Sequence, residues 1–166
     1  MGKVQDKFTN GYAGAVSRSI DEVIISVRNA SAAEIPFGAP VFMTDNGAVP
    51  FDLTTPQDFT TFLGFAVRVP EKTPDSYPLG QNGAAQAGTW PAGDTMEVLV
   101  RGALTLPLVV TGTRGGKVYI RKSDGKLTAS AGSSGTTVLL ENVRIKNPMD
   151  SRSNCCEAVV NKRNIL

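Results

Sequence analysis

The sequence has 166 residues, of which 41% are hydrophobic, with 17 glycines, 10 prolines and a net charge of +2. This length fits one domain that needs neither a disulfide nor a metal to hold its core together. The glycine and proline content favours a fold of many short elements over a helical bundle. The absence of histidine excludes His-dependent Ser and Cys triads and every zinc site that needs an imidazole ligand.

The charge is unevenly distributed along the chain. Residues 1–18 carry a net charge of +2, residues 144–166 carry +3, and residues 19–143 carry −3. Basic ends on an acidic body are consistent with nucleic-acid binding, with docking on an acidic protein surface, or with solvated tails. Between 77 and 93 no Lys or Arg accompanies the aromatic residues, which argues against a site for single-stranded nucleic acid.

We expect a protein made in the cytoplasm that does not cross a membrane. Residues 1–7 have no apolar run behind their charges, which is unlike a secretory signal. No stretch approaches the ~20 apolar residues of a membrane-spanning helix. Cys155 and Cys156 are adjacent, and because consecutive cysteines rarely bridge each other, we interpret both as reduced, buried structural thiols.

The beginning of the chain predicts an N-terminal arm over residues 1–19. Isolated aromatics, Phe8 and Tyr12, stand there among small and polar residues without a sustained period. Such a segment cannot bury enough apolar surface to fold alone. A compact β-barrel domain is predicted over residues 20–147, followed by a C-terminal tail, 148–166.

Short strands with turn signals between them make up the predicted domain. Two-residue alternation and β-branched runs predict the following strands in chain order: 20–28, 40–44, 48–51, 62–69, 96–101, 103–110, 117–121, 136–146 and, in the tail, 157–161. About ten short strands with almost no helical period indicate an all-β fold, a small β-barrel or sandwich with an extended N-terminal arm.

Four local signals give the turns more detail. Asp45–Gly47 and Ser123–Lys126 predict tight hairpin turns, since each contains a glycine after Asn or Asp. Thr55–Asp58 has a capping residue followed by proline and predicts one short helical turn. Gly102, between two strand runs, predicts a bulge or a close backbone approach.

A long loop is predicted over residues 70–93, where prolines and glycines interrupt the strand pattern. A loop of ~20 residues is uncommon in a compact domain and is often functional or disordered. Tyr77 and Trp90 each precede a proline in this loop. Large aromatic rings there either anchor an interface or fold back over the end of the barrel, and the sequence leaves both alternatives open.

The candidate catalytic motifs are weak. Gly112–Val118 is only faintly similar to a phosphate loop, because Thr111 and Val118 stand where glycine and Ser or Thr are required. Asp94 and Glu97 face opposite sides of a strand, and nothing selects a pair of carboxylates for hydrolysis. The sequence predicts no catalytic residue, no metal ligand and no cofactor site.

Several stretches occur in a characteristic order over residues 10–146. They are Tyr12–Gly14, Ser17–Arg18, Pro36–Val41, Phe62–Arg68, Pro91–Asp94, Glu97–Gly102, Gly116–Tyr119 and Asn142–Arg144. In this order the chain resembles the structural cement proteins of tailed phages, a family of small β-barrels that decorates capsids. The resemblance implies a virion protein without an active site or cofactor. It also implies binding to the major capsid protein on the outside of the head, as a dimer or trimer.

Under this resemblance the arm and the long loop are the expected contact regions. Phe8, Tyr12 and Arg18 are the candidate contact residues of the arm, which could order on docking and add a strand to a neighbour. Tyr77 and Trp90 are the candidates in the loop. Two alternatives stay open: a tail or baseplate β-module of a phage, and a β-barrel that binds a small ligand or glycan on Tyr77 and Trp90.

Overall fold

The computed structural model describes residues 10–69, 88–150 and 153–163. In these ranges the chain forms strands and one turn of 3-10 helix, η1 (Phe59–Thr61), which confirms the all-β prediction. The strands are β1 (Val16–Arg28), β2 (Ile35–Pro36), β3 (Pro40–Thr44), β4 (Gly47–Pro50), β5 (Phe62–Ala66), β6 (Thr89–Trp90), β7 (Thr95–Pro107), β8 (Lys117–Arg121), β9 (Leu127–Thr128), β10 (Thr137–Asn147) and β11 (Cys155–Val160). The same ranges contain no helix with the length and apolar character needed to cross a membrane.

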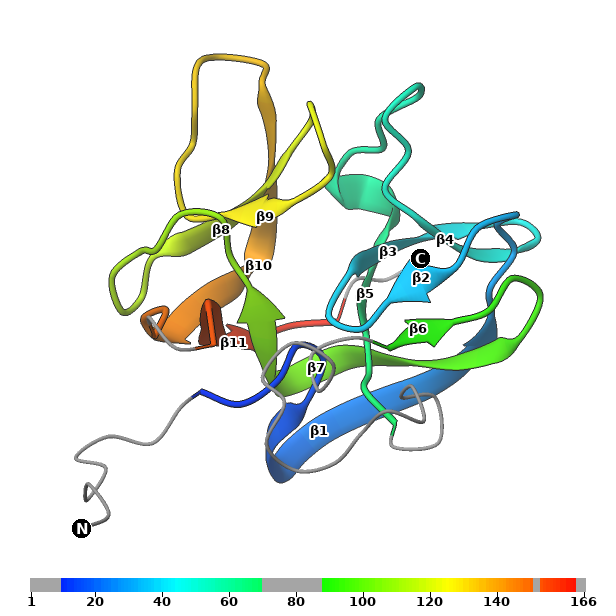
Figure 1. The fold of residues 1–166 in the computed structure, drawn as a ribbon, viewed down its shortest axis with the longest axis horizontal. Helices are drawn as coiled ribbons and strands as arrows, with labels where there is room; N and C mark the ends of the chain where they lie inside the picture. The colour runs from blue at the N-terminus through cyan, green and yellow to red at the C-terminus, as the bar shows by residue number, and fades with distance from the viewer. Residues whose placement is uncertain (1–9, 70–87, 151–152, 164–166) are drawn as a thin grey trace, which may run out of the picture.

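One curled sheet forms most of the fold. Its strands follow the order β4-β3-β5-β7-β11-β10-β8-β9, and β1 pairs along β7 outside this path. The sheet curls into a half-barrel, and the short β2–β6 pair lies over one part of it (Figure 1). One hydrophobic core includes Phe62 and Ile145, and a second core includes Trp90 and Val98.

Gly102 divides β7 between these two cores. Met96, Val98 and Val100 pack in the core that includes Trp90. Leu104 and Leu106, further along the same strand and also even-numbered, pack in the core that includes Phe62. A regular strand keeps alternate residues on one face, so the exchange requires an irregularity, and the register of β1 with β7 shifts in this region. Gly102 has a φ of +123°, and a Cβ at this position would lie 3.0 Å from Glu22 Cα. The predicted bulge or close approach is therefore confirmed.

Both predicted hairpins are confirmed. β3 and β4 pair antiparallel across Asp45–Gly47, and β8 and β9 pair antiparallel across Ser123–Lys126. Asp124 accepts hydrogen bonds from Arg121 within the second turn, and this contact lowers the pKa of the Asp124 carboxyl. The turn chemistry visible in the sequence thus determines the local pairing of these strands.

The short helical turn begins later than the sequence predicts. The structure has it at Phe59–Thr61, after the predicted Thr55–Asp58. Asp58 caps it, because its Oδ1 accepts from Thr60 N at 2.9 Å, and hydrogen bonds from Thr60 lower the pKa of this carboxyl. An ionised carboxylate satisfies the free N–H groups at a helix start, which explains the shifted boundary.

β11 lies in the middle of the curled sheet. It pairs antiparallel with β7 on one side and with β10 on the other. The sequence places these residues in a tail after residue 147, with a short strand at 157–161; the structure shows the strand two residues earlier and within the sheet. Nearly all of its residues are buried, including Cys155 and Cys156. Burial on both faces leaves no alternation to read in the sequence.

Candidate functional site

The N-terminal segment, residues 10–18, packs on the body of the domain along β7. Gly14 N donates to Thr105 O, and Thr105 N donates to Ala15 O, each at 2.8 Å. Gly14 has a φ of +75°, and a Cβ there would lie 2.8 Å from Ala66 O. Only glycine accommodates both this backbone conformation and this close approach.

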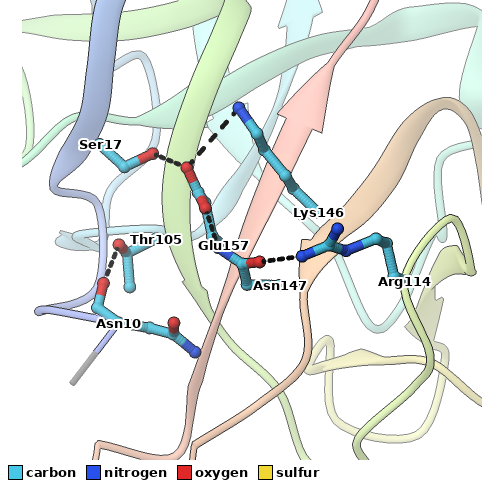
Figure 2. A network of polar contacts seen from close by, with 7 residues as sticks. All are labelled: Asn10, Ser17, Thr105, Arg114, Lys146, Asn147 and Glu157. Carbon is cyan, nitrogen blue, oxygen red and sulfur yellow. Dashed lines mark hydrogen bonds and ion pairs between the residues drawn. The ribbon is translucent and has the colours of Figure 1, made fainter. Parts of the chain in front are cut away.

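Asn10 fixes the start of the segment. Its N–H donates to Asp150 Oδ2 at 2.9 Å, and its Nδ2 donates to Pro148 O and Cys155 O, each at 2.8 Å. Thr105 Oγ1 donates to the Asn10 carbonyl at 2.6 Å (Figure 2). These hydrogen bonds attach the chain at residue 10 to β7, to the beginning of β11 and to the turn before it.

The predicted arm therefore divides near residue 10. Residues 10–19 are attached to the sheet or form the start of β1, and residues 1–9, with Phe8, lie outside the described residues. This attachment was not predicted from the sequence. Backbone and amide hydrogen bonds hold the segment, and such bonds leave no apolar period in the sequence.

A buried carboxylate joins β1, β10 and β11 next to this segment. Glu157 is 5% exposed; Ser17 Oγ donates to its Oε1 at 3.0 Å, and Asn147 Nδ2 donates to its Oε2. Lys146 Nζ lies 3.9 Å from Oε1. Arg114 donates to Asn147 Oδ1 at 3.1 Å and extends the network toward solvent (Figure 2). The buried charge is compensated, and it holds the start of β1 against the last strand.

A row of stacked side chains connects the N-terminal segment to the start of the predicted long loop. The guanidinium carbon of Arg68 lies 5.1 Å from the ring centroid of Tyr12 and 5.6 Å from that of Phe37. Phe37 meets Trp90 edge-on, with centroids 6.2 Å apart. Trp90 is 4% exposed, and its Nε1–H donates to Val67 O at 2.9 Å. We call Tyr12, Arg68, Phe37 and Trp90 the aromatic–arginine column.

The column brings together two of the five predicted contact residues. Tyr12 stands at its outer end and is 39% exposed, whereas Trp90 stands at its inner end in the core. Of the two alternatives for Trp90, the structure agrees with a ring that folds back on the domain, because it is buried in the second core. Arg68 and Phe37 were not predicted as site residues, because stacking between distant segments leaves no local signal.

The side chains of the other three predicted contact residues lie outside the described part of the chain. Arg18 pairs through its backbone with Ala103 in the β1–β7 ladder, but its side chain lies outside the described residues. Phe8 and Tyr77 also lie outside them. Their contact roles stay predictions.

The two thiols are buried, and amides of the glycine-rich turn are already hydrogen-bonded. Burial raises the pKa of the Cys156 thiol to about 12 and also raises that of Cys155, so both are protonated near neutral pH. In the glycine-rich turn, Gly115 N donates to Ile145 O and Gly116 N donates to Thr113 O. One amide is thus bonded to β10 and the other within the turn, whereas the amides of a phosphate loop point toward the bound phosphate. Across the described residues no three His, Cys, Asp or Glu side chains form a group that could hold a metal.

Comparison with known proteins identifies the family. The model of the family described as structural cement protein (E217 gp24/Pam3 gp6) matches residues 2–159. The chain belongs to this phage structural cement protein family. As a member, this cement protein has a capsid cement or decoration role, in agreement with the resemblance noted from the sequence.

A solved structure supports the fold of the cement protein. A chain in "The capsid of Myoviridae Phage XM1" superposes with a TM-score of 0.69 at 17% sequence identity, with 96% of each chain covered. At this identity the similarity concerns the fold alone. No curated protein matches the chain. The family model extends to residue 159, so the region that matches the family includes most of β11.

Proposed function

We propose that this cement protein binds the outer face of a phage head and bridges neighbouring copies of the major capsid protein without catalysing a reaction. Membership of a structural cement family, over residues 2–159, is the observation that carries the proposal. The histidine-free composition and the protonated, buried thiols are consistent with a binding role.

The outer end of the aromatic–arginine column is the proposed contact surface. Tyr12 is exposed but held in place, because its neighbours in the chain are hydrogen-bonded to β7. A large ring fixed in advance loses little conformational entropy on binding, which is why such rings dominate interfaces. Arg68 behind the ring adds a positive charge that suits an acidic partner surface.

Described residues that adjoin both predicted contact regions lie near this surface. Residues 1–9 precede the attachment point at Asn10, and residues 70–87 follow shortly after Arg68 and precede Gly88, which packs on the Phe37 ring. Residues 1–9 include Lys3 and Lys7, so an arm that orders on an acidic neighbour fits the charge of this end. We propose that residues 1–9 form the arm that binds the capsid and that residues 70–87 form the second contact with it.

Weak contacts repeated over the lattice are sufficient for this function. A ligand that binds only the expanded lattice adds its binding free energy to the stability of that state. Geometric linkage of many copies raises the overall affinity far above that of one copy. We therefore propose that the protein is made in the host cytoplasm, associates with itself, and joins the exterior of the virion head.

The decisive assay is co-sedimentation of the purified protein with expanded and unexpanded capsids. Wild type is expected to bind expanded capsids in stoichiometric amounts, and Tyr12→Ala to bind at least about tenfold more weakly. Leu53→Ala is the matched control, because Leu53 is 53% exposed in a different loop. If wild type binds neither form of the capsid, the proposed function is contradicted. If Tyr12→Ala and Leu53→Ala change the affinity equally, the assigned surface is contradicted.

The glycan-binding alternative used Tyr77 and Trp90 as its stacking surface. Trp90 is buried and its N–H is bonded to Val67 O, so this ring does not face a ligand from solvent. Tyr77 lies outside the described residues. No observation in the described residues favours a small ligand over a protein partner.

A further inference from the structure

The outer edge of β1 differs from the other edges of the sheet. β4 is a four-residue edge strand that ends in Pro50. β9 has two residues, and its backbone is covered because Val109 N donates to Leu127 O at 2.9 Å. β1, in contrast, has thirteen residues, and among the described residues only β7 pairs along its length. Figure 1 shows it running beside β7 at the margin of the sheet.

The hydrogen-bond pattern shows which groups of β1 point outward. Val67 N donates to Glu97 O, so the backbone N–H and C=O of Glu97 point toward the β5 side of β7. Because successive residues of a strand point these groups to opposite sides, those of Met96 and Val98 point toward β1. The register pairs Ile25 with Val98, so Ile25 directs its N–H and C=O to β7. Ile24 and Ser26 consequently direct theirs away from the sheet.

β4 covers the C-terminal end of the β1 edge. Ala30 N donates to Ala48 O at 2.8 Å, and a Cβ on Gly47 would lie 2.6 Å from Arg28 O. β4 therefore covers β1 from Arg28 onward. Over Glu22–Val27, no second strand of the described residues pairs with this edge. It contains no lysine or proline, the residues that most often protect an edge strand from pairing.

We infer that Glu22–Val27 is a self-association surface, on which β1 pairs antiparallel with β1 of a second copy around a two-fold axis at Ile24. In this register Val23 faces Ile25 of the second copy, and Glu22 faces Ser26. Apolar residues meet apolar residues and no like charges are opposed, so the edge is complementary to itself. Val23 is already 37% exposed and would be covered.

A second copy fits this edge better than an unrelated strand for a reason of symmetry. An isologous pair uses the free edge of both copies at once and closes, so no further copies are added. The inference names the surface for the self-association proposed above. The oligomeric state of the free protein tests it without capsids, so its failure is distinguishable from failure of the cement function.

The test compares Ser26→Pro with Ser26→Ala in the full chain, by sedimentation velocity over a concentration series. Proline removes an outward N–H without touching the β7 ladder, and alanine retains that N–H. Wild type and Ser26→Ala are expected to dimerise, and Ser26→Pro to dimerise at least about tenfold more weakly. A monomeric wild type, or equal dimerisation of the two variants, overturns the inference.

A second pair of variants covers the case in which Ser26→Pro fails to fold. Val23→Lys places a charge in the proposed interface, and Val109→Lys is its control, since Val109 is similarly exposed at 43% but lies after β7. Loss of the dimer in Val23→Lys alone supports the surface. Dimers that persist in both variants contradict it.

Discussion

The guanidinium of Arg68 lies over two rings, with its carbon 5.1 Å from the centroid of Tyr12 and 5.6 Å from that of Phe37. Tyr12 belongs to the N-terminal segment, and Phe37 follows β2 and packs in the second core. One side chain, two residues after β5, therefore joins the segment that leads to residues 1–9 with a ring that packs against Trp90 and Gly88.

Arg68→Lys is expected to lower the free energy of unfolding by about 0.5–2 kcal/mol, and Arg68→Ala by at least as much. Lysine keeps the charge, but its compact ammonium cannot contact both rings as the planar guanidinium does. Urea denaturation measures the difference. Arg28→Lys, at an exposed position, is the control and should stay within about 0.5 kcal/mol of wild type. A full retention of stability in Arg68→Lys would show that the stacking is incidental.

Two truncations test where the arm ends. Deletion of residues 2–9 should leave the free energy of unfolding unchanged and weaken attachment to capsids. Deletion of residues 2–15 should also destabilise the domain by about 2 kcal/mol or more, because it removes Asn10, Gly14 and their hydrogen bonds to the sheet. Thermal and urea unfolding, with capsid co-sedimentation, give both readouts. Equal stability of the two truncations would contradict the attachment at residue 10.

Glu157→Gln tests the buried carboxylate. The amide keeps one acceptor but presents an NH2 group to either Ser17 or Asn147, so one of these two donors loses its acceptor on the buried side chain. We expect a loss of about 1–3 kcal/mol in the free energy of unfolding. Lys146→Ala is the control: its ion pair is 3.9 Å long and partly exposed, so its loss should cost less than about 1 kcal/mol. The reverse order of effects would mean that the ion pair between β10 and β11 contributes more to stability than the hydrogen-bonded network around Glu157.

The raised pKa of the Cys156 thiol predicts that the free energy of unfolding falls at alkaline pH. Its pKa is raised by burial to about 12 in the folded state. The proton is thus held more tightly in the folded than in the unfolded chain. The resulting stability is fully present below the unfolded-state pKa, near 9.0, and is lost as the pH rises toward about 12, by up to about 1.4 kcal/mol per pH unit.

Urea denaturation of wild type and Cys156→Ala checks this sign. The variant should be less stable at neutral pH because of the cavity it creates, and its stability should change less between pH 9 and 12. For each protein, the free energy of unfolding at alkaline pH is compared with its own value at neutral pH. The contributions of the lysines and tyrosines, which both proteins share, then cancel between wild type and variant. Parallel pH profiles would show that the thiol does not titrate on unfolding in this range.

Local sequence signals predicted much of the fold because they act over a few residues. Asp45–Gly47 and Ser123–Lys126 form the expected turns, and Gly102 marks the irregularity in β7. β11 was predicted only as a short strand in a tail. Its residues are buried on both faces, so they show no alternation, and only its partners in space place it in the sheet.

The contact site was less predictable, because it depends on contacts between distant segments. The sequence singled out Tyr12 and Trp90 as isolated aromatics, but not Arg68 and Phe37, which join them. A buried indole needs an acceptor for its N–H, and the one that Trp90 finds, Val67 O, is a backbone atom without a sequence signature.

Cryo-electron microscopy of expanded capsids incubated with the protein tests the central claim most directly. We predict density for the half-barrel on the outer face of the lattice, with Tyr12 and Arg68 turned toward the major capsid protein and residues 1–9 extended along it. Capsids that carry no such density, or that carry it on the inner face, would contradict the account.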